Sequence, residues 1–213
     1  MHHTILKDGS GYPFYLTDFK LMNIQDLLKS ESAEHITVAT QTVSQIWKPF
    51  QELCELAVTA VKNGNKIIFF GNGGSAADAQ HLAAELIVRY RVNRAPIAAI
   101  SITTDTSIIT AGANDFGYDT IFENQLRALG KKGDIAIGLT TSGNSKNVLK
   151  ALSTARELGI TPAAFSGGTG GKISDVAHPI IIVPSTVIAR IQEMHIFIGH
   201  VFCDVLEQSV TTN

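Results

Sequence analysis

Five short apolar segments alternate with helical patterns through the middle of the chain. The apolar segments span 66–70, 97–102, 134–139, 161–166 and 179–184. They are continuously apolar rather than alternating, as in strands that are buried on both faces of a parallel sheet. Helical patterns lie between them at 76–90, 119–129 and 145–158. This alternation predicts an α/β fold, with a doubly wound, five-stranded, mainly parallel sheet flanked by helices.

Helical patterns also precede and follow this region. Residues 23–63 favour one or two helices with apolar positions such as Ile36, Val43, Ile46 and Trp47, and 188–208 predicts a long apolar helix. Residues 1–21 fit neither pattern, and we interpret them as a natural extension or an added remnant, with Met22 a reasonable start. We expect 22–213 to form a single domain.

The composition of the chain limits the classes of binding partner that we expect. A net charge of -2 argues against the basic surface that nucleic-acid binding uses, and leaves an anionic small molecule open. Cys54 and Cys203 have no zinc or redox spacing, which predicts buried free thiols. There is no membrane-length apolar stretch and no signal-peptide pattern, so we expect a cytoplasmic protein that does not bind membranes.

Two glycine-rich segments resemble nucleotide-binding motifs without completing them. "GNGGSA" (71–76) matches G-x-G-x-x-A, but the acidic residue expected about 20 positions on is missing, since the first acid after the next strand is Asp105. "GGTGGKIS" (167–174) is one residue short of the P-loop spacing before Lys172, and Ile173 stands where a magnesium-binding hydroxyl is required. We expect the second segment to be a flexible loop.

"TTSGNS" (140–145) is more informative, because it joins a predicted strand to a predicted helix. Hydroxyls and glycine-freed amides at a helix start form an anion site that the helix dipole reinforces. Plain N-capping by Ser142, Asn144 or Ser145 is the alternative. Four hydroxyls in six residues exceed the need of one cap, which favours phosphate binding.

His81 and Glu85 lie one helical turn apart, and polar residues interrupt the last apolar helix. The pair suits a metal site or a positioned base, and also an ordinary surface pair. In the last helix Gln192, His195 and His200 need partners, because burying such groups unpaired costs roughly 1–3 kcal/mol each. Gln192 and His200 lie about 12 Å apart along an ideal helix. Spacing alone does not establish that they converge.

Taken together, the motifs resemble the phosphoheptose isomerase family of the sugar-isomerase (SIS) domain superfamily. The matching segments are "GNGGSAADAQHLAAEL", "TTDTS", "ANDFGY", "TTSGNS" and "RIQEMHIFIGH", and the resemblance covers about 25–208. It implies a flavodoxin-like fold and the isomerisation of sedoheptulose 7-phosphate to D-glycero-D-manno-heptose 7-phosphate through an enediol. That reaction leads to the heptose of bacterial lipopolysaccharide or capsule.

The resemblance also implies roles for individual residues and an assembly. The implied catalytic pair is Glu85 and His200. The family's zinc ligands, for one ion per site, fall on His81, Glu85, Gln192 and His200. Its substrate contacts fall on Asn72, Gly73, Gly74, Glu85, Asn114, Asp115, Thr140, Thr141, Ser142, Ser145 and Gln192. The implied assembly is a homotetramer with active sites at subunit interfaces.

One segment departs from the family pattern. "PSTVIA" (184–189) is short and less polar than expected, and resembles the non-catalytic relative that binds the bacterial replication initiator protein. That relative lacks the equivalents of Glu85 and His200, and this chain has both. We therefore expect an isomerase, with an initiator-binding module and a sugar-phosphate-sensing regulator as the alternatives.

Overall fold

The computed structural model describes residues 5–7, 13–15 and 23–211. By its contacts the chain divides into two units, 1–36 and 37–213. In the first unit, β1 (Ile5–Lys7) pairs antiparallel with β2 (Pro13–Tyr15). The rest of the predicted 1–21 extension, and the suggested start at Met22, lie outside the described residues.

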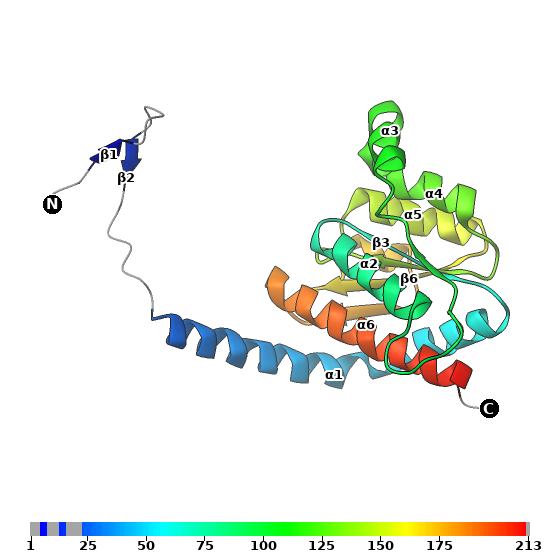
Figure 1. The fold of residues 1–213 in the computed structure, drawn as a ribbon, viewed down its shortest axis with the longest axis horizontal. Helices are drawn as coiled ribbons and strands as arrows, with labels where there is room; N and C mark the ends of the chain where they lie inside the picture. The colour runs from blue at the N-terminus through cyan, green and yellow to red at the C-terminus, as the bar shows by residue number, and fades with distance from the viewer. Residues whose placement is uncertain (1–4, 8–12, 16–22, 212–213) are drawn as a thin grey trace. The chain divides into compact units, whose positions relative to one another are not determined.

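The second unit contains the predicted five-stranded sheet, and all its strands are parallel (Figure 1). Its strands are β3 (Ile67–Gly71), β4 (Ala99–Ser101), β5 (Ile135–Leu139), β6 (Thr161–Gly167) and β7 (Ile180–Val183). The spatial order is β4-β3-β5-β6-β7. Counted along the chain this order is 2-1-3-4-5, the flavodoxin-like arrangement.

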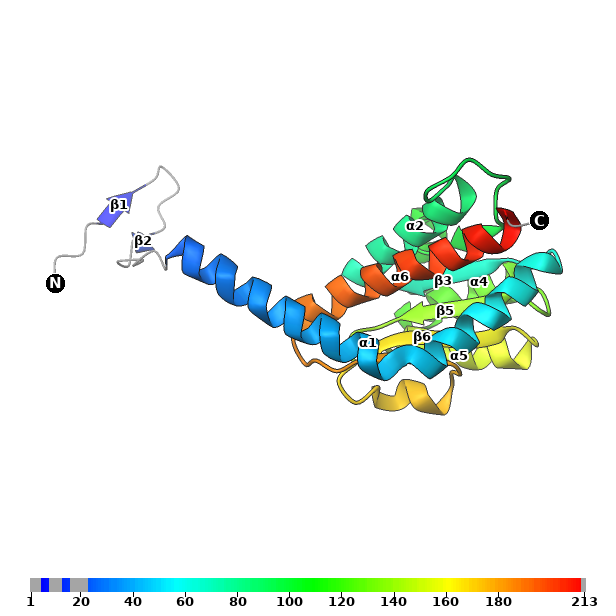
Figure 2. The same ribbon diagram turned by 90° about the horizontal axis from the view of Figure 1, so that it is seen from below.

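Helices cover both faces of this sheet (Figure 2). Residues 38–60 of α1 (Ile24–Lys62) pack on one face together with α2 (Gly74–Ile87) and α6 (Ile188–Thr211). On the other face lie α4 (Ile121–Leu129) and α5 (Lys146–Glu157). Helix α3 (Thr106–Phe116) buries none of its residues. The continuous apolar strands of the sequence are thus buried between two helical layers, as predicted.

Residues 24–62 form one helix, which is the simpler of the two expected arrangements, because the segment contains no glycine and Pro49 removes only one backbone donor. Two details differ from the sequence-based expectation. Helix α3 was not predicted, although Asp105 caps it by accepting from the Ile108 N–H at 2.9 Å. Short 3₁₀ helices occur at Tyr118–Thr120 and at Gly171–Asp175, where a flexible loop was expected.

Both cysteines are buried free thiols, as predicted. Burial raises the pKa of the Cys54 thiol to about 12 and raises the pKa of Cys203 as well. Within the described part of the chain, no helix is long and apolar enough to cross a membrane.

Candidate active site

Two of the predicted site motifs follow the carboxyl ends of β3 and β5. These strands are neighbours, with Gly71 beside Leu139 at their ends, and the chain then leaves toward opposite sides of the sheet. In open α/β sheets ligands bind in the crevice at this reversal of strand order. The loops that follow the two strands carry the "GNGGSA" and "TTSGNS" segments, so topology alone brings both motifs to one edge.

The 140–145 loop is held by its own hydrogen bonds. The side chain of Thr140 is buried, and its hydroxyl lies 3.1 Å from the Ser145 hydroxyl. The exposed Ser142 hydroxyl accepts from the Asn144 N–H at 3.2 Å. Ser145 precedes α5, yet its side chain caps none of the N–H groups of the first turn. The loop therefore offers hydroxyls beside a helix N-terminus that Ser145 leaves uncapped, as an anion site requires.

The second glycine-rich segment supports this loop. Gly143 has a φ of +66°, and a Cβ there would collide with the carbonyl oxygen of Gly170. The Lys172 N–H donates to the Asn144 side-chain oxygen at 3.2 Å, and Ile173 is fully buried. The segment that resembles a P-loop thus packs beneath the 140–145 loop.

Asn72, a predicted substrate contact, is fixed by two residues that sequence reasoning missed. Its amide exchanges two hydrogen bonds with the buried Asn147 amide, at 2.9 and 2.8 Å. Its side-chain oxygen also accepts from the Tyr118 hydroxyl at 3.0 Å. Tyr118 is the last residue of the "ANDFGY" motif, and Asn147 lies two residues after "TTSGNS". Their positions in or beside matched motifs could have identified them from the sequence. The neighbouring Gly73 adopts a φ of +56° at the start of α2.

A cluster of titratable side chains joins α2 to α6. His81 Nε2 lies 3.3 Å from Glu85 Oε1 and 2.9 Å from His200 Nε2, although His200 is 119 positions away in sequence. The Tyr90 ring stacks on the His200 imidazole, with centroids 5.4 Å apart and an interplanar angle of 22°. Helix packing therefore brings together the predicted catalytic pair and one further predicted ligand.

The surroundings of His200 favour its neutral form. Burial lowers the pKa of its imidazole and proximity to His81 lowers it further, while Glu85 acts in the opposite direction. A neutral imidazole near pH 7 can accept a proton, and the adjacent Glu85 carboxylate can do the same. The cluster is chemically suited to moving protons.

The same three residues fit a divalent metal ion. One ligand atom from each of His81, Glu85 and His200 lies within 4.8 Å of the others. Two ligands of a tetrahedral zinc ion lie about 3.4 Å apart, given bonds of about 2.0–2.2 Å. The observed separations of 2.9 and 3.3 Å are close to that value. Nitrogen and carboxylate donors also match the preference of zinc.

Gln192, the fourth predicted ligand, belongs to α6, and its side chain lies beside the start of α2. Its amide packs against Gly74, where a Cβ would come 2.9 Å from the Gln192 Cδ. Gly74 precedes His81 by seven residues, about 10 Å along a helix axis. The structure thus groups three of the four predicted ligands and places Gln192 near the glycine loop.

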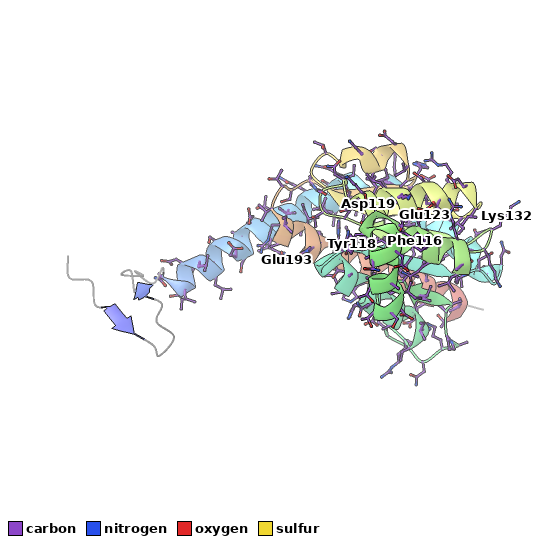
Figure 3. The ribbon with its side chains drawn as sticks, turned by 90° about the horizontal axis from the view of Figure 1, so that it is seen from above. Phe116, Tyr118, Asp119, Glu123, Lys132 and Glu193 are labelled. Atoms are coloured by element: carbon purple, nitrogen blue, oxygen red, sulfur yellow. The ribbon has the colours of Figure 1, made fainter. Side chains whose placement is uncertain are left out.

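Asn114 and Asp115 lie near the end of the exposed helix α3. The Asn114 amide donates to the Asp115 carboxylate at 2.8 Å. Their neighbours Phe116 and Tyr118 are 70% and 54% exposed (Figure 3). The bond from Tyr118 to Asn72 connects this region to the rest of the site.

His195 belongs to the interior and not to the cluster. It is fully buried, and its Nε2 lies 3.1 Å from the Ser166 carbonyl oxygen, to which it can donate. Its Nδ1 has no hydrogen-bond partner among the described residues. Burial lowers its pKa to about 4, with the Ser166 contact opposing this shift.

Comparisons with known proteins identify the family of the chain. Residues 32–167 match the SIS domain family model. The chain is 55% identical over 186 residues to the phosphoheptose isomerase of Paramagnetospirillum magneticum, covering 87% of this chain and 97% of that protein. It is also 55% identical over 159 residues to the Aquifex aeolicus phosphoheptose isomerase, covering 75% of this chain and 83% of that protein.

Solved structures extend the likeness to three dimensions. The phosphoheptose isomerase of Neisseria gonorrhoeae superimposes with a TM-score of 0.82 at 39% identity, covering 87% of this chain and 100% of that one. The Francisella tularensis phosphoheptose isomerase gives 0.84 at 34% identity, with 88% and 100% covered. By sequence and fold, the chain belongs to the phosphoheptose isomerase family of SIS-domain proteins.

Proposed function

We propose that this protein interconverts sedoheptulose 7-phosphate and D-glycero-D-manno-heptose 7-phosphate in bacterial heptose biosynthesis. The names of its relatives support this activity. The observation that carries the proposal is the His81–Glu85–His200 cluster, which lies on the same two helices, α2 and α6, that contain Gly74 and Gln192. A binding module has no need of a carboxylate and an imidazole brought together in this way.

In the proposed reaction the loops after β3 and β5 bind the substrate, and the His81–Glu85–His200 cluster transfers the protons. The 140–145 loop binds the phosphate through Thr141, Ser142 and Ser145 and the start of α5, while Asn72 and its glycines contact the sugar chain. Glu85 takes the proton from the carbon beside the carbonyl and returns it to the neighbouring carbon. His200 transfers the proton between the two oxygens, so that a ketose becomes an aldose through an enediol.

We further propose one zinc ion per site, held by His81, Glu85 and His200 with Gln192 as the fourth ligand. When bound, the ion would polarise the substrate carbonyl. The donor set and its spacing support this assignment. Because Gln192 packs on Gly74 in the present arrangement, its side chain would have to turn toward the cluster.

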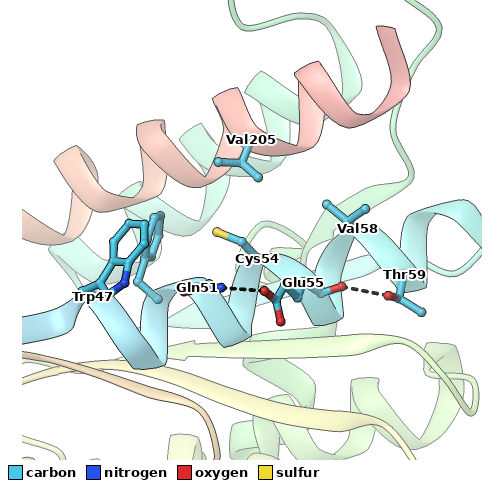
Figure 4. A pocket seen from close by; sticks show the side chains of 8 residues that line it. Trp47, Gln51, Cys54, Glu55, Val58, Thr59 and Val205 are labelled. Atoms are coloured by element: carbon cyan, nitrogen blue, oxygen red, sulfur yellow. Dashed lines mark hydrogen bonds between the residues drawn. The ribbon is translucent and has the colours of Figure 1, made fainter. Parts of the chain in front are cut away.

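We also propose the homotetramer, with active sites shared between subunits. An apolar surface on α1 and α6 supports it, since Val43, Trp47, Phe197 and Val201 are 38–67% exposed and line one groove. A second groove continues along the same helices from Trp47 to Thr59 and Val205 (Figure 4). Exposed apolar area of this kind typically marks a protein interface. Asn114 and Asp115, on the exposed α3, would complete the site of a neighbouring subunit.

The buried thiols of Cys54 and Cys203 support a reducing compartment, and we place the enzyme in the cytoplasm. The initiator-binding alternative is less well supported. The relatives reported above are named isomerases, and Glu85 and His200 are both present.

The test is to incubate the purified protein with sedoheptulose 7-phosphate and follow the aldose by NMR. We expect aldose formation, with a rate that falls on chelation and is restored by zinc. His81→Ala should lose rate and no longer respond to the chelator, because it lacks a ligand. A wild type that forms no aldose, with or without zinc, overturns the isomerase proposal and returns attention to replication-initiator binding.

A further inference from the structure

The segment that follows α2 folds back onto α6 and is fixed there by one buried carboxylate. Glu207 is 2% exposed and accepts three consecutive backbone N–H groups. These are the N–H groups of Tyr90, Arg91 and Val92, at 2.9, 2.7 and 3.0 Å. Three charge-assisted hydrogen bonds to one carboxylate fix the backbone of 90–92 at a defined place on the helix.

Arg94 connects this anchor to the proposed catalytic carboxylate. Its Nε lies 3.2 Å from Glu207 Oε2, and both side chains are 2% exposed. Its Nη2 donates to the backbone carbonyl of Glu85 at 2.9 Å. That carbonyl belongs to the last turn of α2, where helical partners run out. Glu207 and Arg94 therefore link the end of α2, residues 90–92 and α6.

Within this segment Tyr90 contacts a side chain of the cluster through its ring. Its ring stacks on the His200 imidazole at 5.4 Å. The Arg91 guanidinium lies 5.1 Å from the Tyr90 ring centroid and pairs with Asp204 at 3.2 Å. His200, Asp204 and Glu207 are spaced four and three residues apart, so they share one face of α6. The segment thus contacts three residues that follow one another along that face of α6, namely His200, Asp204 and Glu207.

We propose that Tyr90 is a positioning residue for His200, with Glu207 and Arg94 as the anchor that holds it. The proposal rests on the isomerase function argued above. An imidazole at a half-buried helix position can rotate about two side-chain bonds, and a stacked ring restricts that rotation. Proton transfer depends steeply on such placement, because a misplacement of about 1 Å can cost roughly a hundredfold in rate.

The alternative is that Tyr90 only fills space, since it also packs against the apolar core. Two variants distinguish these roles. Tyr90→Leu keeps an apolar side chain but removes the stacked ring, and Tyr90→Phe keeps the ring and removes only the hydroxyl. If Tyr90 positions His200, the ring is required and the hydroxyl is not.

The kinetic test compares these two variants with the wild type. We expect Tyr90→Leu to lower kcat by roughly tenfold to a hundredfold, with KM within about twofold, because the substrate-binding loop is untouched. Tyr90→Phe should retain the wild-type kcat. An unchanged kcat in Tyr90→Leu overturns the proposal. A loss confined to KM, or an equal loss in Tyr90→Phe, overturns it as well, because the residue would then act on the substrate.

A spectroscopic test needs no activity. In protein carrying ¹³C-labelled histidine, the His200 ring signal is assigned by its absence from His200→Asn. Stacking on Tyr90 shields that signal, so Tyr90→Leu should move it downfield and Tyr90→Phe should not. An unmoved signal in Tyr90→Leu overturns the proposal. If the wild type lacks isomerase activity but the signal moves as expected, the proposed function fails while the contact stands.

Discussion

The two parts of the site are built in different ways. The 140–145 loop consists of six consecutive residues held by hydrogen bonds among themselves and by the Gly170 turn beneath them. The His81–Glu85–His200 cluster contains three side chains from two helices, and its members are up to 119 positions apart. A local motif can therefore specify the binding part, whereas the chemical part exists only once α2 and α6 have packed.

The two parts also differ in their chemistry. The loop offers hydroxyls and backbone amides, which bind an anion without changing protonation near neutral pH. The cluster offers a carboxylate and two imidazoles, whose function depends on protonation. Changes to the cluster should therefore affect turnover, and changes to the loop should affect substrate binding.

The largest effect is expected from Glu85→Gln. Glutamine keeps the size of the side chain but cannot take up a proton, so kcat should fall by about 10²–10⁴-fold while KM changes little. Steady-state kinetics with sedoheptulose 7-phosphate measure this. Glu157→Gln on the exposed surface of α5 is the matched control and should leave kcat unchanged. A fully active Glu85→Gln enzyme would remove the cluster from the mechanism.

A smaller effect, on binding, is expected from the double variant Ser142→Ala, Ser145→Ala. Each hydroxyl lost from a charged phosphate costs roughly 1.5–3 kcal/mol, so the loss of two should raise KM by at least about a hundredfold if the two costs add. Ser153→Ala, farther along α5, is the control. If the double variant keeps its KM, the phosphate binds elsewhere. If kcat falls with KM unchanged, the division between the two parts is wrong.

The sequence predicted the sheet and the position of the 140–145 loop between a strand and a helix, because both depend on local signals. Continuous apolar runs specify buried parallel strands, and small residues after a strand specify a ligand loop. Polarity alone treats His195 and His200 alike, as polar residues in an apolar helix, and only the family resemblance singled out His200. The packing of α6 gives the physical difference, because it places His195 against Ser166 and His200 against His81. The roles of Asn147 and Tyr90 likewise depend on contacts between distant segments.

The proposed tetramer can be tested through Trp47 on α1. If Asn114 and Asp115 on α3 complete a neighbouring site, breaking the assembly should also reduce activity. Trp47 is the single tryptophan of the chain and is 67% exposed on the apolar surface of α1. In the proposed tetramer it would be buried, so its fluorescence should be blue-shifted and light scattering should give four subunits. Trp47→Glu should dissociate the assembly and reduce activity, because Asn114 and Asp115 would no longer complete a neighbouring site. A wild-type monomer at micromolar concentration contradicts this proposal.

The last prediction concerns the pH dependence of stability. It depends on His195, a buried residue of α6 that lies outside both parts of the site. His195 lies under the loop, since Ser166, whose carbonyl it contacts, adjoins Gly143. Its pKa is about 4 in the folded protein and about 6.5 in the unfolded chain. The unfolded state therefore binds more protons in this range, and stability falls as the pH decreases. The neutral ring makes its full contribution to the free energy of unfolding above about pH 6.5. This contribution is lost progressively as the pH falls toward 4, by up to about 3 kcal/mol.

Urea unfolding between pH 4.5 and 7.5 measures this loss. His195→Gln cannot titrate yet retains a donor for the Ser166 carbonyl, so its stability should vary less with pH than that of the wild type. The lowered pKa of His200 acts in the same direction in both proteins. The lowered pKa values of Asp134 and Glu207 reduce stability mainly as the pH falls below the ordinary pKa values of these carboxyls, and they do so equally in both proteins. The difference between the two curves therefore isolates His195. Parallel curves would mean that His195 is protonated on acidification without unfolding, and that the core beneath the loop opens to water.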